Sequence, residues 1–271
     1  MDKRAIGVFD SGMGGLTTVR ELERRLPHED IIYFGDTGRV PYGSRSPETI
    51  LRYARQDVAF LRTFDLKAIV IACGTVSSIA LDEISKECPV PVIGVVEPAV
   101  KAAAEATKNE KVGLIGTQST IASGSYERIL RKILPGTEVT ARACPLFVPL
   151  VENGRFRRGD ALVDMVVAEY LEPFKEAGVD TLVLGCTHYP LLAEAIGGYL
   201  GPEVSLVSSG AACVETVHRV LADNGLETDA PGVGTRRYFA SDSPESFEAL
   251  ASIFLGEDIR HQAVQIAIET Y

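Results

Sequence analysis

The sequence lacks an excess of basic side chains. It has 27 Lys and Arg against 37 Asp and Glu, and its formal net charge is −10. Proteins that bind nucleic acid need clustered Lys and Arg to face the phosphates. The composition therefore predicts no nucleic-acid partner. It leaves a small anionic substrate open, because backbone N–H groups at helix N-termini can hold an anion without basic side chains.

Long hydrophobic runs are also missing. No apolar run approaches the roughly 18 residues of a membrane span, and a strand pattern begins as early as residue 5. We therefore expect no membrane segment and no signal peptide, and a cytoplasmic location in which thiols stay reduced.

Cysteine is sparse and widely spaced, with no Cys-x-x-Cys pair. A redox pair of the usual spacing is thus excluded. Cys186 and His188 lie close in sequence, but no second Cys or His pair completes a tetrahedral metal site, so we expect no metal. The remaining thiols are expected to be small buried side chains, as free cysteines commonly are: Cys88, Cys144 and Cys213.

The glycine-rich turn after the first strand lacks one glycine of the dinucleotide fingerprint. The turn reads Gly12-Met13-Gly14-Gly15, and Thr17 stands where the third glycine would be needed. Nicotinamide binding is therefore not expected, and no lysine lies in a setting that indicates a pyridoxal Schiff base. The turn still places Asp10 and Ser11 at the carboxyl end of the strand, where ligands of α/β sheets bind.

Two apolar strands that each end at a cysteine are the main positive signal. Residues 68–72 precede Cys73, and residues 181–185 precede Cys186. Uninterrupted apolar runs of this length are typical of strands buried in parallel sheets. We expect each thiol to lie before a helix, where the macrodipole favours a thiolate, with the hydroxyl of Thr75 or Thr187 nearby.

Two thiols on opposite faces of one carbon could remove a proton from one side and return one to the other. His188 would then tune Cys186, and Asp10 would tune Cys73. From spacing alone other interpretations stay open. His188 could be a surface or capping residue, Glu152 a solvated loop carboxylate, and Tyr42 a turn residue.

Strands and helices alternate along the chain, which predicts an α/β fold with mainly parallel sheets flanked by helices. A weak internal similarity indicates two similar lobes with the active site in the cleft between them. We expect the first lobe to comprise residues 1–97 and 209–271, and the second residues 98–208. Single helices are expected from residue 74 to 87 and from 190 to 200, a strand over 92–96 with a helix from Pro98, and a tail that rejoins the first lobe through a strand at 236–240.

Several segments together resemble the glutamate racemases, within the aspartate/glutamate racemase superfamily. They occur in the family's order over most of the chain and are specific in combination. The matching segments are residues 9–17, Gly35-Asp36-Thr37, Pro41-Tyr42-Gly43, Ala72-Cys73-x-Thr75, Cys144-Pro145 with residues 148–152, and residues 185–192.

The resemblance implies a cofactor-independent two-base racemase that interconverts L- and D-glutamate for peptidoglycan synthesis, commonly as a cytoplasmic homodimer. By the same resemblance Cys73 and Cys186 are the acid/base residues, supported by Asp10, His188 and Glu152. The residues implied in substrate binding are Asp10, Ser11, Tyr42, Gly43, Gly74, Thr75, Thr187 and His188, with Thr117 and Thr120 as further candidates.

One position departs from the family pattern, because Gly74 stands where the family usually has Asn. Glycine offers only its backbone to a substrate. A racemase of aspartate or another amino acid is therefore an alternative. A catalytically weak glutamate-binding regulatory protein is another, although binding alone has no need for two opposed thiols. The family's usual Asp near residue 208 is also replaced, by Ser208.

Overall fold

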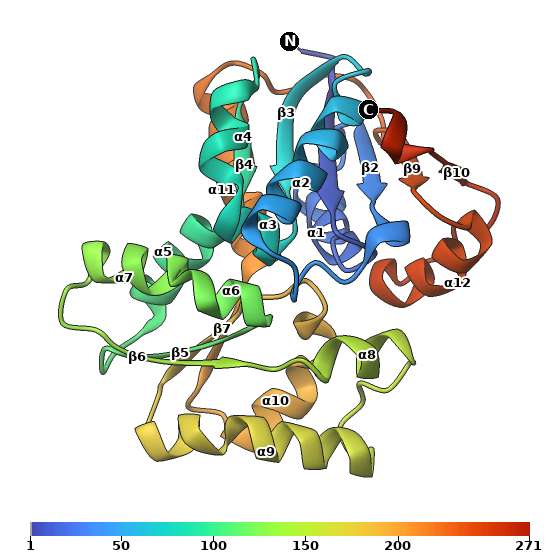
Figure 1. The fold of residues 1–271 in the computed structure, drawn as a ribbon. Coiled ribbons are helices and arrows are strands. Elements are labelled where there is room, and N and C mark those ends of the chain that lie inside the picture. The colour runs from blue at the N-terminus through green and yellow to red at the C-terminus, as the bar shows by residue number, and fades with distance from the viewer. Residues whose placement is uncertain (1) are drawn as a thin grey trace.

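The computed structural model describes residues 2–271 and contains two parallel sheets, one above the other in Figure 1. The upper sheet has six strands in the order β10-β9-β2-β1-β3-β4, and the lower sheet has four in the order β6-β5-β7-β8. All neighbouring strands are parallel. The α/β fold class predicted from the alternating pattern is thus confirmed. The strands are β1 (Ala5–Asp10), β2 (Ile31–Gly35), β3 (Leu66–Ile71), β4 (Val92–Gly94), β5 (Lys111–Gly116), β6 (Glu138–Ala143), β7 (Thr181–Leu184), β8 (Ser205–Ser208), β9 (Arg236–Ala240) and β10 (Ala263–Gln265).

Helices connect the strands and cover both sheets. Several begin at a side-chain cap, as α2 does where Ser46 accepts from the backbone N–H of Thr49. The helices are α1 (Leu16–Arg25), α2 (Pro47–Leu61), α3 (Gly74–Ile79), α4 (Leu81–Glu87), α5 (Val96–Ala106), α6 (Gln118–Ser123), α7 (Ser125–Ile133), α8 (Phe147–Glu152), α9 (Ala161–Ala177), α10 (Ala193–Leu200), α11 (Ser209–Asp223) and α12 (Pro244–Leu255), with short 3-10 turns η1 (Thr37–Arg39), η2 (Tyr189–Leu192) and η3 (Ile268–Thr270).

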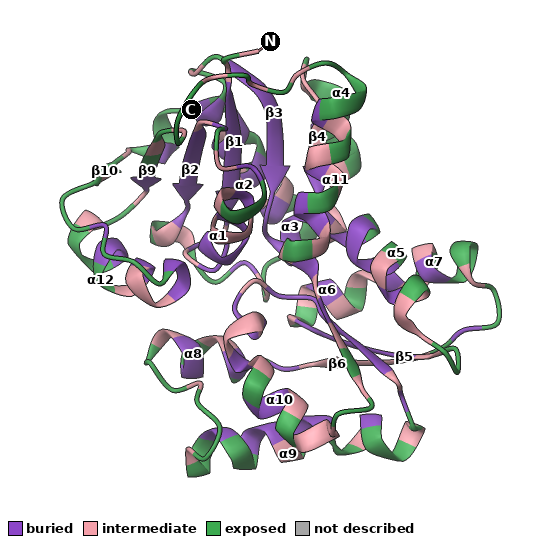
Figure 2. Cartoon of the chain, turned by 180° about the vertical axis from the view of Figure 1, so that it is seen from behind, coloured by how far each residue is buried: buried purple, intermediate pink, exposed green. Residues whose placement is uncertain are grey.

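The central strands β1, β2 and β3 of the upper sheet bury both faces, as their apolar runs predict. In β1, Ile6 and Val8 pack on the side of α1 and α11, whereas Phe9 packs on the side of α2 and α3. Successive side chains of a strand point to opposite faces, so both faces need a helical layer. Figure 2 shows β1, β2 and β3 almost entirely in the colour of buried residues.

The lower sheet is covered in the same way. Val112 and Val183 contact the helices α5 and α7, and Leu182 and Leu184 belong to the core that contains Phe174 of α9. Helix α9 lies along the lower edge of the molecule, with one face buried and the other exposed (Figure 2). A buried stripe of this kind is typical of an amphipathic helix packed on a sheet.

The chain passes from the upper sheet to the lower one after β4 and returns after β8. The tail then rejoins the upper sheet, since β9 pairs with β2 and β10 pairs with β9. Both chain ends lie on the same side of the upper sheet in Figure 1. The lobe boundaries at residues 97/98 and 208/209 remain a prediction, and residue 1 lies outside the described residues.

Some predicted elements were wrong. The strand expected over residues 92–96 ends at Gly94, and α5 begins at Val96 rather than at Pro98. The helix expected over 74–87 is interrupted at Ala80, which separates α3 from α4. The helix expected after Pro190 begins as the 3-10 turn η2, and α10 follows it from Ala193.

The strand order of each sheet defines a crevice. In the upper sheet β1 and β3 are neighbours, and the connections that follow them lead toward opposite edges of the sheet. In the lower sheet the same is true of β5 and β7. Ligands of open α/β sheets bind outside the carboxyl ends of strands at such topological switch points. Asp10 is the last residue of β1 and Cys73 follows β3, while Thr117 and Cys186 follow β5 and β7.

A buried ion pair fixes the opposite, amino-terminal end of β3. The ammonium of Lys67 is fully buried, pairs with Glu29, and donates to the carbonyls of Asp2 and Leu226 at 2.9 Å each. It therefore connects β3 to the segments before β1, before β2 and after α11.

Replacing Lys67→Met should lower the free energy of unfolding by about 3–5 kcal/mol, because it leaves the buried carboxylate of Glu29 without a counter-charge. Urea denaturation measures this change. Lys86→Met is the matched control, since Lys86 makes an exposed pair with Glu83 and its loss should change the free energy of unfolding far less. Equal losses for the two variants would contradict the account.

Candidate active site

A cavity of about 420 Å³ lies where the carboxyl ends of the two sheets face each other. Both strand-terminal thiols reach it, and both are largely buried, Cys73 at 5% exposure and Cys186 at 8%. The residues that line it are Ser11, Gly12, Val40, Pro41, Tyr42, Gly43, Ser44, Cys73, Gly74, Thr75, Thr117, Gln118, Pro145, Val148, Pro149, Glu152, Gly185, Cys186, Thr187, His188 and Tyr189.

Cys73 lies at the N-terminus of the short helix α3, with its Sγ 3.4 Å from the Oγ of Ser11. The hydroxyl expected beside it, that of Thr75, instead contacts the hydroxyl of Thr117 at 2.9 Å. Burial, together with the charge of Asp10, raises the pKa of Cys73 to about 12. The thiolate favoured by the helix position is thus not the resting form, because desolvation outweighs the backbone N–H groups.

Cys186 lies in a chain of polar contacts. Its Sγ is 3.9 Å from Nδ1 of His188, whose Nε2 is 2.9 Å from Oε1 of Glu152. Burial alone would lower the pKa of His188, but the hydrogen bonds with Cys186 and Glu152 outweigh it and raise the pKa to about 10. Protonated His188 stabilises the folded state fully below its unfolded pKa of about 6.5. That contribution is lost as the pH rises through about 10.

Asp10 lies behind the cavity and does not line it. It is 1% exposed, and its Oδ2 accepts from the N–H of Gly12 at 3.1 Å. Among residues 2–271 its Oδ1 has no hydrogen-bond partner. Burial raises the pKa of Asp10, although the nearby His188 opposes this. Asp10 therefore provides a buried acceptor between the two halves of the site.

Glycines allow the two sides of the cavity to touch. A Cβ on Gly74 would lie 2.2 Å from the carbonyl oxygen of Gly185, and one on Gly14 would lie 2.1 Å from Oγ1 of Thr187. At Gly74 any other residue would force a movement of the backbone, whereas at Gly14 it would force the side chains of Thr187 and His188 to move. Gly74 thus lets the turn after Cys73 rest directly against the turn before Cys186.

Three hydroxyls from both sheets form a cluster at one end of the cavity. Thr117 lies 2.9 Å from Thr75 and 2.9 Å from Thr120, and Thr75 lies 3.4 Å from Thr120, measured between Oγ1 atoms. Thr75 and Thr117 line the cavity, whereas Thr120 is buried behind them. The cluster offers hydroxyl donors to an anionic group.

The structure gathers nearly all residues proposed from the sequence. Asp10 and Thr120 lie just behind the cavity wall, and the others line it. Part of the cavity wall is apolar, and its residues were not among the site residues expected from the sequence. The proline-rich stretch after Cys144 was the available signal for it. The unassigned lining residues are Gly12, Val40, Pro41, Ser44, Gln118, Pro145, Val148, Pro149, Gly185 and Tyr189.

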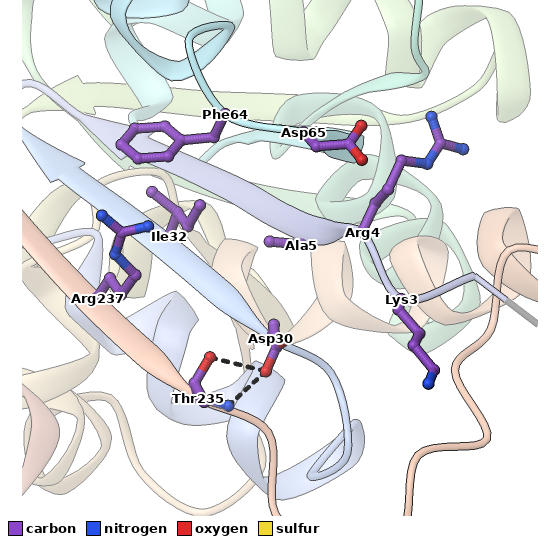
Figure 3. Close-up of a pocket in the computed structure, with 9 residues that line it drawn as sticks. All are labelled: Lys3, Arg4, Ala5, Asp30, Ile32, Phe64, Asp65, Thr235 and Arg237. Carbon is purple, nitrogen blue, oxygen red and sulfur yellow. Dashed lines mark hydrogen bonds between the residues drawn. The ribbon is translucent and has the colours of Figure 1, made fainter.

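A second depression of about 360 Å³ lies at the amino-terminal end of the upper sheet (Figure 3). Its lining includes Lys3, Arg4 and Arg237 as well as Asp30 and Asp65. The carboxylate of Asp30 accepts hydrogen bonds from the backbone N–H and the hydroxyl of Thr235, as the dashed lines in Figure 3 mark. Since neither Cys73 nor Cys186 lines it and it lies at the opposite ends of the strands from both thiols, this depression is not the candidate active site.

No group of three or more His, Cys, Asp or Glu side chains within residues 2–271 is arranged to hold a metal ion. None of the helices described there is long and apolar enough to cross a membrane.

The two thiols should differ in reactivity. At pH 8 iodoacetamide should modify Cys186, beside protonated His188, faster than Cys73, and Asp10→Asn should lower the pKa of Cys73 and speed its alkylation. Peptide mass spectrometry across pH measures both rates. Cys213 is fully buried and should stay unmodified. Modification of Cys213 would therefore indicate that the whole protein unfolds during the experiment. Equal rates for Cys73 and Cys186, unchanged in Asp10→Asn, would contradict the assigned environments.

Comparisons with known proteins agree with this geometry. The model of the Asp/Glu/Hydantoin racemase family matches residues 6–240. The glutamate racemase of Geobacter metallireducens is 46% identical, over 94% of this chain and 94% of its own length.

Solved structures are similar over the whole chain. The glutamate racemase isoform RacE1 from Bacillus anthracis superposes with a TM-score of 0.93 at 39% identity, covering 98% of each chain. Glutamate racemase from Francisella tularensis, crystallised in complex with D-glutamate, superposes with a TM-score of 0.92 at 37% identity, covering 100% of each chain. The chain therefore belongs to the Asp/Glu/Hydantoin racemase family, and its relatives within that family are the glutamate racemases.

Proposed function

We propose that this protein racemises glutamate, using Cys73 and Cys186 as its two acid/base residues. The observation that carries the proposal is the pair of thiols that reach one cavity from opposite sheets. The relatives that match over nearly the full length are glutamate racemases. We further propose that the protein supplies D-glutamate for peptidoglycan, acts as a cytoplasmic homodimer, and needs no cofactor.

The reaction transfers two protons at one carbon. One thiolate removes the Cα proton of the bound enantiomer, which converts that thiolate to a thiol and leaves a carbanion. The opposite thiol then gives its proton to the other face of the carbanion and becomes a thiolate. The roles of Cys73 and Cys186 are exchanged for the other enantiomer, so both residues are required in both directions.

The resting protonation favours one assignment. The raised pKa of Cys73 keeps it as the thiol, and the protonated His188 places a positive charge 3.9 Å from the sulfur of Cys186. In this state Cys186 is the base and Cys73 the acid. After a turnover the charges are reversed, so the resting state returns when Cys186 loses a proton to solvent and Cys73 gains one from solvent, a step that the charge of Asp10 near Cys73 favours.

The substrate carboxylates would be held without basic side chains. Among residues 2–271 no Lys or Arg lines the cavity. The hydroxyls of Thr75 and Thr117 and the backbone N–H groups of the strand-terminal turns are the available donors. The apolar residues Val148 and Pro149 would exclude water, which strengthens every electrostatic interaction that stabilises the carbanion.

Single thiol variants test the proposal. Cys73→Ala and Cys186→Ala should each lower racemisation of L-glutamate by about 10²–10⁴-fold, followed by circular dichroism without added cofactor. Cys213→Ala is the control, because Cys213 is buried outside the cavity. Full activity in either active-site variant would contradict the two-base scheme. A wild-type enzyme that racemises aspartate but not glutamate would contradict the substrate assignment.

The contact at Gly74 gives a second test. Gly74→Ala would force Gly185, and with it the turn that carries Cys186, away from Cys73, so kcat should fall by about 10–100-fold. Gly197→Ala is the control, since its Cβ would meet only Leu206 at an ordinary 3.6 Å. Similar kcat values for the two variants would show that the close approach of the turns does not matter for proton transfer.

A further inference from the structure

A buried polar cluster lies beside the cavity and has no part in the proton transfers. It comprises Asp36, Arg39, Tyr42 and Asp57, from the segment after β2 and from α2. The side chains of Asp36 and Asp57 are fully buried, and that of Arg39 is 10% exposed. The cluster encloses the segment that carries Tyr42 and Gly43 to the cavity wall.

Arg39 is the centre of the cluster. Its Nε donates to Oδ2 of Asp36 at 2.6 Å, its Nη2 to Oδ1 of Asp57 at 2.8 Å, and its Nη1 to Oε1 of Gln56 at 2.5 Å. Its guanidinium also lies over the ring of Tyr53 at 4.2 Å. Only a planar fork of donors can satisfy three acceptors in this arrangement.

The cluster reaches the cavity segment directly. The hydroxyl of Tyr42 donates to Oδ2 of Asp36 and lies 3.3 Å from Oδ2 of Asp57. The tail contributes as well, because the Oγ of Ser241 donates to Oδ1 of Asp36 at 2.7 Å. Tyr42 itself is 1% exposed and lines the cavity, so its buried hydroxyl contacts tie the cluster to the cavity wall.

The other side of the same segment is held by the second sheet's helix α6. The carbonyl of Gly43 accepts from both the backbone N–H and the hydroxyl of Ser119, each at 2.9 Å. A Cβ on Gly43 would lie 2.8 Å from Cβ of Thr117. The segment 40–44 therefore spans from the buried cluster to the cavity's hydroxyl cluster, and its position depends on both ends.

We propose that Arg39, with Asp36 and Asp57, is a positioning residue that holds the segment 40–44 against the cavity and so sets the affinity for substrate. The proposal rests on the proposed function. Stability alone does not account for the cluster, because a buried ionic group gives little net stability over apolar packing of the same volume. What the ionic cluster provides is one fixed geometry for Tyr42 and Gly43.

The test compares Arg39→Lys with Arg55→Lys. Lysine keeps the positive charge, but its single ammonium cannot replace three bonds that leave from three separate nitrogen atoms of a planar guanidinium. Arg55 lies on α2, the helix that carries Asp57, and makes an exposed pair with Glu87, so Arg55→Lys is the matched control. Arg39→Lys should raise KM for glutamate about tenfold with kcat changed less than about twofold, and the control should change neither.

Hydrogen exchange of the same variants keeps the test independent of catalysis. In Arg39→Lys the amides of residues 37–46 should exchange about tenfold faster, while those of β1 and β3 keep their wild-type rates. Unchanged exchange at residues 37–46, or an unchanged KM in an active enzyme, would overturn the proposal. If the wild-type protein does not turn over glutamate, the proposed function fails and the exchange result alone decides the positioning role.

Chemical rescue tests the proposal if the lysine of Arg39→Lys takes over the contacts of Arg39. Arg39→Ala should show the raised KM and the faster exchange, and added ethylguanidine should reverse both by refilling the fork site. Arg55→Ala treated in the same way is the control. Two results together would overturn the proposal. These are wild-type exchange rates at residues 37–46 in a folded Arg39→Ala protein, and no effect of ethylguanidine on that protein.

Discussion

The direct contact between two strand-terminal turns is the constraint on which the site depends. Gly74 follows one cysteine and Gly185 precedes the other, and no side chain fits between them. Because both turns end buried parallel strands, neither can shift without disturbing a packed core. The two thiols are therefore brought to one cavity by rigid elements of different sheets, which is the requirement for acting on opposite faces of one carbon.

Burial gives the two thiols unequal environments. Cys73 lies near the buried carboxylate of Asp10, and Cys186 lies near His188, which Glu152 orients. A carboxylate disfavours a second negative charge, whereas an imidazolium favours one. In the two-base scheme proposed above, the site would therefore start with Cys73 as the acid and Cys186 as the base, although both groups are cysteines. This asymmetry comes from the neighbours and not from the strand ends, which are alike.

Much of this arrangement could be predicted from the sequence, because it follows from local patterns. Apolar runs before Cys73 and Cys186 predicted buried parallel strands, and their carboxyl ends predicted a shared site. The two polar clusters could not be predicted in this way. The partners of Thr75 and Arg39 come from distant segments, and only the packed structure brings them together.

The pKa of Cys73 shows a second limit of the sequence. The helix start after Cys73 predicted a stabilised thiolate, but burial depends on what covers the residue, and that is a property of the whole fold. The ends of β4 and the break at Ala80 were likewise set by packing and not by local propensity.

The distribution of deuterium between L- and D-glutamate in the first turnovers tests the central claim most directly. L-Glutamate would be incubated with the enzyme in D2O to low conversion, and the two enantiomers separated and analysed for deuterium at Cα. Two opposed thiols predict deuterium in the D-glutamate formed and almost none in the remaining L-glutamate. Retention of the original proton in the product, or equal labelling of both enantiomers from the start, would show that a single base serves both faces and would contradict the account.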